Sequence, residues 1–274
     1  MPSDLRQLIA ALDLWTPDDP MPVLFVGHGN PMNAIEDTVF STTWDALGVH
    51  LPRPTAILCI SAHWLTDGEI RVSAVDAPET IHDFYGFPDA LYEQQYRAPG
   101  ASDSARQVAD MVDARCIATD DHRGLDHGAW SVLMRMYPHA DIPVFQLSLD
   151  YPMAPRDHYH LARQLKPLRE KGVLILGSGN LVHNLRRMRQ DAPPYDWAIE
   201  FDTLMTERME RGDDLSVVDF QKLGVLARQA HPTWDHFLPL IYTLGQRDTA
   251  DRLFYFNDGF DLSSVSMRSL MLIR

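Results

Sequence analysis

The chain has 274 residues, with 24 Lys and Arg against 38 Asp and Glu and a net charge of −14. This length can bury one large α/β core or two smaller ones, and no Pro-rich or Gly/Ser-rich linker marks a boundary. The acidic balance repels phosphate backbones, and the largest basic cluster is residues 186–189, which argues against nucleic acid as a partner. We therefore predict a single domain spanning residues 1–274.

Apolar runs and cysteines suggest a compartment. No run approaches the roughly 20 residues that a membrane span needs, and residues 1–6 are polar, without the apolar stretch of a secretory signal. Cys59 lies inside an apolar run and Cys116 near another, as expected of buried thiols in a reducing compartment. We expect a soluble, cytoplasmic protein with no membrane partner.

Strand-like and helical patterns alternate along the chain. Strands are predicted at 22–27, 55–61, 70–75, 142–149, 173–178 and 264–273, with a weaker one near 115–119. Helices are predicted at 3–13, 101–113, 156–170, 197–210 and 236–246. The alternation predicts an α/β fold whose mostly parallel or mixed central sheet is flanked by helices on both faces.

Residues 77–99 form an aromatic-rich excursion without clean periodicity, which includes Phe84, Tyr85 and Phe87. Aromatic loops on an α/β scaffold often wall a binding pocket. The alternative is a loop that simply packs onto the core. The sequence favours neither.

Three histidines, His28, His63 and His183, each follow a short apolar run typical of a buried strand. Ligands in open α/β sheets gather beyond the carboxyl ends of the strands, so these side chains are expected to converge. A lone histidine at such a position is more often structural, but three in equivalent positions favour a shared site. Because imidazole is the commonest metal ligand, a mononuclear metal centre is the first hypothesis.

A fourth histidine, His236, is expected to open the helix at 236–246 and to point toward the same crevice, with Asp235 as a partner that orients its ring. His183 lies where a strand is expected to turn into a helix. It is either a metal ligand or a base beside the metal.

His127 stands between Asp126 and Gly128, just before a helix-like segment. Such a histidine suits proton transfer, with Asp126 able to orient the ring. The alternative is an aspartate helix cap beside an incidental histidine. The histidines at 50, 122, 139, 158, 160 and 231 lack comparable settings and are predicted to be structural or on the surface.

Other chemistries fit poorly. The turn at residues 27–32 lacks the third glycine of a dinucleotide loop, because Met32 takes its place, and residues 177–182 fail in the same way. The sequence contains no phosphate-binding P-loop motif, no G-x-S-x-G nucleophile elbow and no H-E-x-x-H. Nucleotide binding and nucleophilic hydrolysis are therefore disfavoured.

Six motifs in order resemble the class III extradiol ring-cleavage dioxygenases, and most of all the 4,5-DOPA extradiol dioxygenase branch. The motifs are GHGNPMN at 27–33, SAHW at 61–64, IHDF at 81–84, LDHG at 125–128, GNLVHN at 179–184 and HFLPL at 236–240, and the resemblance as a whole runs from about residue 22 to residues 264–269. The resemblance implies an α/β catalytic domain that opens a catechol ring with O₂ at a non-haem metal.

Carried over residue by residue, the resemblance implies that His28, His63 and His236 hold the metal. His183 would be a fourth ligand or an acid/base, and His127 would lie near the substrate hydroxyls. The wider class uses two histidines and one carboxylate on Fe(II), whereas this chain has His236 where the carboxylate is expected.

The implied cofactor is one divalent metal ion per chain, Fe(II) for ring cleavage or Zn(II) as described in related proteins. A catechol such as L-DOPA and O₂ would be the partners, with the protein a monomer or small homo-oligomer. A base must take a phenolic proton and an acid must return one as the ring opens, which suits His183 and His127. A zinc-dependent hydrolase or lyase and a silent catechol-binding protein are the alternatives.

Overall fold

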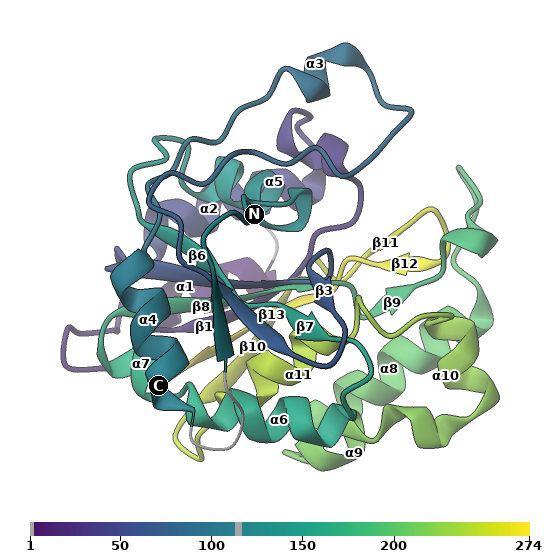
Figure 1. The fold of residues 1–274 in the computed structure, drawn as a ribbon. Helices are drawn as coiled ribbons and strands as arrows, with labels where there is room; N and C mark the ends of the chain where they lie inside the picture. The colour runs from purple at the N-terminus through teal and green to yellow at the C-terminus, as the bar shows by residue number, and fades with distance from the viewer. Residues whose placement is uncertain (1–2, 113–116) are drawn as a thin grey trace.

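The computed structural model describes residues 3–112 and 117–274 and is built around a six-stranded sheet, with strand order β10-β13-β1-β8-β2-β6 (Figure 1). Its strands are β1 (Val23–Gly27), β2 (Ala56–Ser61), β6 (Val144–Gln146), β8 (Val173–Gly179), β10 (Arg252–Phe256) and β13 (Ser269–Ile273). Strands β1, β8, β2 and β6 are parallel, whereas β13 and β10 run antiparallel. The predicted α/β fold with a mixed sheet is confirmed.

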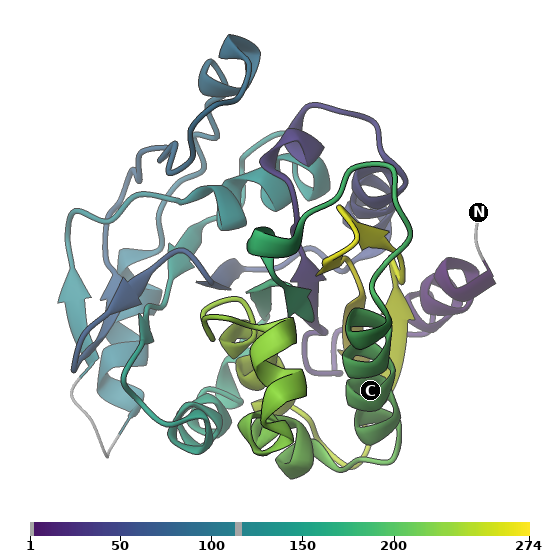
Figure 2. The same ribbon diagram turned by 90° about the vertical axis from the view of Figure 1, so that its right-hand side faces the viewer.

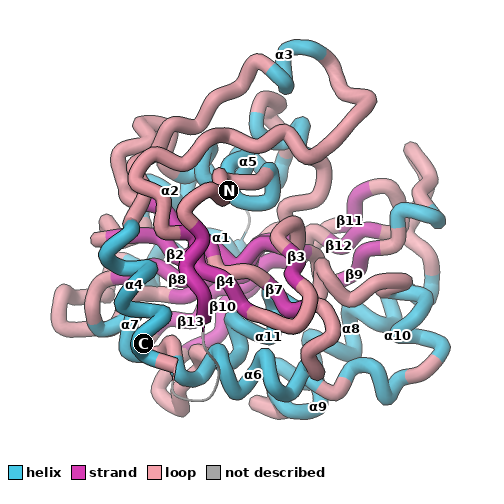
Figure 3. Tube along the Cα trace, in the orientation of Figure 1, coloured by secondary structure: helices cyan, strands magenta, loops and turns pink. Residues whose placement is uncertain are grey.

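Helices cover both faces of this sheet, and loops connect the elements around its edges (Figure 3). The helices are α1 (Ser3–Leu12), α2 (Val39–His50), α3 (Asp89–Tyr92), α4 (Ser102–Met111), α5 (His127–Met136), α6 (Pro155–Gln164), α7 (Pro167–Glu170), α8 (Asp196–Glu210), α9 (Asp214–Val218), α10 (Val225–Ala230) and α11 (Leu238–Gly245). Short 3₁₀ helices are η1 (Pro31–Ala34), η2 (Leu185–Arg187) and η3 (Phe220–Leu223).

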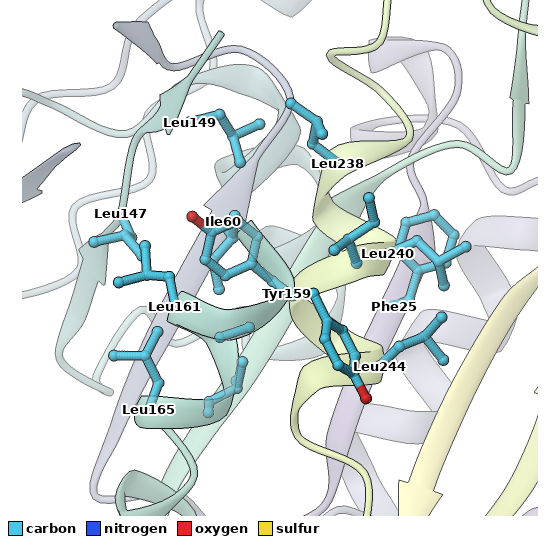
Figure 4. Packing of buried hydrophobic residues seen from close by; sticks show 14 of the residues in the cluster. Phe25, Ile60, Leu147, Leu149, Tyr159, Leu161, Leu165, Leu238, Leu240 and Leu244 are labelled. Carbon is cyan, nitrogen blue, oxygen red and sulfur yellow. The ribbon is translucent and has the colours of Figure 1, made fainter. Parts of the chain in front are cut away.

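Successive residues of β1 enter two separate cores, because side chains alternate between the faces of a strand. Val23 and Phe25 pack with residues of α6, α8 and α11. Leu24 and Val26 pack with residues of α1, α2 and α5 on the opposite face. Figure 4 shows the first of these cores, where leucines of α6 and α11 meet Phe25 and Ile60.

Several predicted elements are divided in the structure. The helix predicted at 156–170 breaks into α6 and α7 before Pro167. The backbone nitrogen of Pro167 carries no hydrogen, so it cannot donate the hydrogen bond that would continue α6. The strand predicted at 142–149 becomes β6 and β7 (Leu149–Asp150), and the one at 264–273 becomes β12 (Val265–Ser266) and β13.

Other elements were placed differently or missed. The strand predicted at 70–75 is β4 (Ile70–Ser73), which pairs with β5 (Ile117–Asp120) in a separate two-stranded sheet. Residues 115 and 116 of the weaker prediction, including Cys116, lie outside the described residues. Helix α2 and strand β10 were not predicted. The part of the chain that the structure describes has no helix long and apolar enough to cross a bilayer.

Two smaller features frame the carboxyl edge of the sheet. A three-stranded sheet joins β9 (Val182–His183), β12 and β11 (Phe260–Asp261), and another pairs β3 (Leu65–Thr66) with β7. The excursion at 77–99, which carries α3, projects away from the body in both ribbon views (Figures 1 and 2). The site lies between these features.

Candidate active site

A pocket of about 380 Å³ opens beyond the carboxyl ends of the parallel strands. Both β1 and β2 pair with β8, so the segments that leave them lie close together. His28 follows β1 directly and His63 lies two residues beyond β2. The structure brings every predicted site residue into this pocket: its lining includes His28, His63, His127, His183 and His236.

The imidazole rings of the pocket lie close to one another. The Nε2 atoms of His28 and His63 are 3.1 Å apart. The ring of His236 lies 5.3 Å from that of His28 and 5.0 Å from that of His63, measured between centroids. His183 stacks on His236, with centroids 3.4 Å apart and an angle of 8° between the rings.

Ligand atoms approach one another closely in two groups. One atom each from His28, His63 and His127 lie within 4.8 Å of one another, and so do atoms of His183, Asp235 and His236. The first group contains His127, which the sequence resemblance places near the substrate instead. The first group offers three nitrogen donors, and the second offers two nitrogens and a carboxylate oxygen, both of which are donor sets for a divalent metal ion.

Buried hydrogen bonds determine which nitrogen of His28 faces the pocket. The single hydroxyl proton of Ser178 is donated to the carbonyl oxygen of Gly128, at 2.5 Å. Ser178 must therefore accept the second bond, from Nδ1 of His28 at 3.0 Å. His28 then carries its proton on Nδ1, and its Nε2 lone pair points toward His63.

Carboxylates hold the other two rings in the same way. Nδ1 of His63 lies 3.4 Å from Asp83, and Nδ1 of His236 is hydrogen-bonded to Asp235. Burial, reinforced by neighbouring histidines, lowers the pKa of His28 and of His63 well below the ordinary value, so both rings are neutral. Neutral imidazoles with facing Nε2 lone pairs and bonded Nδ1 atoms are the arrangement of metal ligands, and these residues fit a divalent metal.

His127 is oriented by Asp83, not by Asp126 as expected. Asp83 accepts hydrogen bonds from the backbone nitrogen of His127 at 2.9 Å and from its Nδ1 at 3.0 Å. Burial acts to raise the pKa of Asp83, but the bonds and charge of His127 and His63 hold it below its usual range. The carboxylate is therefore ionised and bridges His63 and His127.

Asp126 has a structural role, that of the helix cap given as the alternative in the sequence analysis. It caps α5 by accepting from the backbone nitrogen of Ala129. Its buried carboxylate also accepts from Ser61 at 2.6 Å, and from Arg123 and Gln146 at 2.8 Å each. Asp126 therefore ties the end of β2 to the start of α5, where His63 and His127 lie.

Gly128 packs so closely against Ser61 and His63 that no side chain fits at this position. A Cβ atom there would clash with Oγ of Ser61 and lie 3.0 Å from Cδ2 of His63. Any side chain would push the His63 ring out of place. The glycine next to His127 thus has a packing role in the pocket.

His183 and His236 occupy local structures that differ from the expectation. His183 lies on the short strand β9, and a 3₁₀ turn follows it instead of an α-helix. Helix α11 begins at Leu238, so His236 precedes it, and the carbonyl oxygen of His236 accepts from the backbone nitrogen of Asn180. No hydrogen bond of the His183 ring occurs among the described residues, and burial lowers its pKa.

The aromatic excursion walls the pocket at one end and packs on the core at the other. Phe84, Tyr85 and Phe87 line the pocket, and Phe84 meets the ring of His127 edge-on at 5.6 Å. Tyr96 is buried, and its hydroxyl donates to the carbonyl oxygen of Tyr137. Both interpretations of this segment are therefore correct for different parts of it.

The six histidines predicted to be structural or on the surface do not line the pocket. His158 and His231 are fully buried and hydrogen-bonded to backbone carbonyls, those of Asp150 and Leu181. Those at 50, 122, 139 and 160 are exposed. Asp83 was not predicted as a site residue, although it stands within the IHDF motif and its carboxylate was the available signal.

The fold and pocket define an α/β protein with a histidine-rich, metal-type site at the strand ends. Residues 24–263 match the family described as the catalytic LigB subunit of aromatic ring-opening dioxygenase. The chain belongs to this family. Its relatives are named as extradiol dioxygenases, so the chain is an enzyme of the ring-opening dioxygenase class.

Curated relatives and a solved structure agree with this assignment. The chain is 40% identical over 261 residues to "4,5-DOPA dioxygenase extradiol" of Escherichia coli, which covers 92% of this chain and 94% of that protein. It is also 40% identical over 233 residues to the protein of the same name from Beta vulgaris, with 81% and 85% covered. The crystal structure of an uncharacterized Escherichia coli protein superposes with a TM-score of 0.78 at 34% identity, covering 92% of this chain and 99% of that one.

Proposed function

We propose that this chain is an Fe(II)-dependent dioxygenase that opens the ring of a catechol such as L-DOPA by 4,5-extradiol cleavage, and that residues 1–274 form its catalytic domain. The observation that carries the proposal is the convergence of neutral, hydrogen-bonded histidines beside His127, whose ring is oriented by an ionised Asp83. The names of the relatives support the substrate class.

The proposed ligands of the single metal ion are His28, His63 and His236. His183, stacked on His236, is either a fourth ligand or an acid/base. When bound, Fe(II) would supply the charge that acidifies a chelating catechol and the electrons that activate O₂. The protein's contribution is the placement of the nitrogen donors and of the groups that move protons.

His127 is the proposed proton-transfer residue beside the substrate hydroxyls. Because its Nδ1 is bonded to Asp83, its Nε2 is the nitrogen left to face the pocket. A neutral imidazole in this tautomer can accept a phenolic proton, and the Asp83 carboxylate stabilises the imidazolium that results. His183, with no competing bond to its ring among the described residues, is the second candidate for moving a proton.

The pocket also has the dimensions and walls for a single aromatic ring. Its volume of about 380 Å³ lies at the lower end of the range for small-molecule sites. Phe84, Phe87 and Val265 contribute apolar surface that keeps water from the reacting ring.

The test is reconstitution of the metal-free protein under argon with Fe(II) or Zn(II), followed by L-DOPA and O₂. We expect a yellow ring-opened product from the Fe(II) protein, with matching oxygen uptake. Failure of the Fe(II) protein to consume O₂ with any simple catechol would contradict the proposal.

A zinc-dependent hydrolase or lyase is the second candidate, because the proposed ligands are all imidazole nitrogens, which suit zinc. Zinc has no redox chemistry, so the Zn(II) protein should not cleave the ring. Hydrolysis of aryl esters by the Zn(II) protein, with no oxygen uptake by the Fe(II) protein, would favour this candidate.

A further inference from the structure

The pocket has two aspartates in its lining, and they differ in their partners. Asp83 is committed to His63 and His127. Asp261 forms no ion pair with any Lys or Arg in residues 3–112 and 117–274, and no Lys or Arg of these residues lines the pocket. One carboxylate therefore faces the pocket without a compensating cation.

The register of the small sheet directs Asp261 into the site. Val265 of β12 pairs with His183 of β9 on one side and with Asp261 of β11 on the other. Directly paired residues project from the same face of a sheet, and all three line the pocket. Two strand spacings separate Asp261 from His183, about 10 Å. That spacing suits a catechol ring near the histidines whose short side chain reaches Asp261.

The turn after Asp261 is held in a fixed conformation. Leu262 and Ser263 adopt φ values of 50° and 64°, which non-glycine residues adopt only when their surroundings impose them. The hydroxyl of Ser263 lies 2.8 Å from the carbonyl oxygen of Ala192 and 3.1 Å from that of Arg189, so its one proton is donated to this pair of carbonyls, and the hydroxyl of Ser264 donates to the carbonyl oxygen of Asn184. Asp261 is thereby positioned before any ligand arrives.

The surroundings of Asp261 favour a cationic ligand. Burial raises the pKa of its carboxyl, because the charged form loses water without gaining a cation. Leu262 and Val265 beside it are apolar. A ligand ammonium would restore the missing interaction, and the net charge of −14 attracts cationic molecules. A side chain whose only charge is a carboxylate would instead meet an unpaired like charge.

We propose that Asp261 binds the ammonium group on the side chain of the catechol substrate, so that the pocket selects aminoalkyl catechols over catechols with a neutral or carboxylate side chain. This specificity rests on the proposed ring-cleavage function. It names the chemical class of the substrate: a catechol whose short side chain carries a primary amine, as that of L-DOPA does.

Binding to the Zn(II)-loaded protein tests the proposal without turnover. Calorimetry compares dopamine, which has an ammonium, with neutral 4-methylcatechol and with dihydrocaffeate, which has a carboxylate. We expect dopamine to bind about tenfold more tightly than 4-methylcatechol, and dihydrocaffeate to bind more weakly than both. The Asp261→Asn variant should lose the tenfold preference and keep its affinity for 4-methylcatechol, which also reports that its pocket is folded.

Two matched variants complete the experiment. Asp258→Asn changes an exposed carboxylate near β11 that does not line the pocket and should alter nothing. Asp261→Glu keeps the charge and should retain a preference for dopamine. Equal binding of dopamine and 4-methylcatechol by the unaltered protein, or tighter binding of dihydrocaffeate, overturns the proposal.

Turnover distinguishes this proposal from the proposed function. If the Fe(II) protein cleaves all three catechols and Asp261→Asn lowers kcat/KM equally for each, the ammonium site is wrong and ring cleavage stands. If no catechol is bound or cleaved, both are wrong.

Discussion

The two walls of the pocket are built differently. The inner wall, around His28, His63 and His127, rises directly from the parallel strands and α5. Its rings are held by a buried bond to Ser178 and by the partly buried carboxylate of Asp83. The outer wall comes from η2 and the β11–β12 hairpin, whose strands are two residues long. Leu185 and Met188 on this wall are about half exposed.

This difference separates two tasks. The inner wall positions donors before any ligand binds, and its geometry depends on the core of the fold. The outer wall contacts the pocket through side chains on short turns, where substitutions leave the core intact. We expect changes to the inner wall to affect metal and chemistry, and changes to the outer wall to affect only which substrate binds.

Removal of an inner-wall ring should have the largest effect. His28→Ala deletes a proposed ligand, and we expect metal affinity to fall by more than about 100-fold, since loss of a partner behind a ligand alone costs 10–100-fold. Equilibrium dialysis with Zn(II) measures this. Met188→Ala on the outer wall is the control and should bind metal normally. Equal metal retention by both variants would remove His28 from the ligand set.

Asp126→Asn should destabilise the fold that supports the inner wall. The amide would place N–H groups against donors from Ser61, Arg123 and Gln146, so the free energy of unfolding should fall by about 3 kcal/mol. Urea denaturation checks the value. Asp103→Asn, which changes an exposed carboxylate on α4, should cost almost nothing, and a similar loss in both variants would deny Asp126 its structural role.

Asp83→Asn should slow turnover more than it harms folding. The amide can still accept from His127 but no longer stabilises its protonated form, so kcat should fall about 10–100-fold. Steady-state oxygen uptake measures kcat, and circular dichroism reports the fold. Unchanged kcat would show that His127 needs no carboxylate.

His231→Gln should change the pH dependence of stability. Burial lowers the pKa of His231 from 6.5 to about 4, although its bond to Leu181 acts in the opposite direction. The unfolded chain therefore binds a proton that the folded chain excludes, and stability present above pH 6.5 is lost as the pH falls toward about 4. The stability of the variant should fall by about 2–3 kcal/mol less over this interval, measured by urea denaturation at each pH. Identical pH profiles would exclude His231 from this titration.

The sequence predicted the inner wall better than the outer one. Apolar runs located β1, β2 and β8, and the histidines beyond their ends follow from the geometry of parallel strands. The bond between Asp83 and His127 spans 44 residues and depends on how the aromatic excursion folds back. Local sequence favoured Asp126, the adjacent carboxylate, which caps a helix instead.

The outer wall escaped prediction for a different reason. Its strands β11 and β12 are too short to give a periodic pattern, and the turn between them is held by backbone hydrogen bonds to the 184–195 segment. Asp261 therefore has no local signal. Its orientation becomes apparent only from its pairing with Val265.

The structure of the Fe(II)-loaded protein with a bound catechol, determined under argon, tests the central claim most directly. The account predicts the metal on ring nitrogens of His28, His63 and His236, with His127 facing a catechol oxygen. A metal held by His28, His63 and His127, the alternative group of closely spaced nitrogens, with His236 unbound, would contradict it.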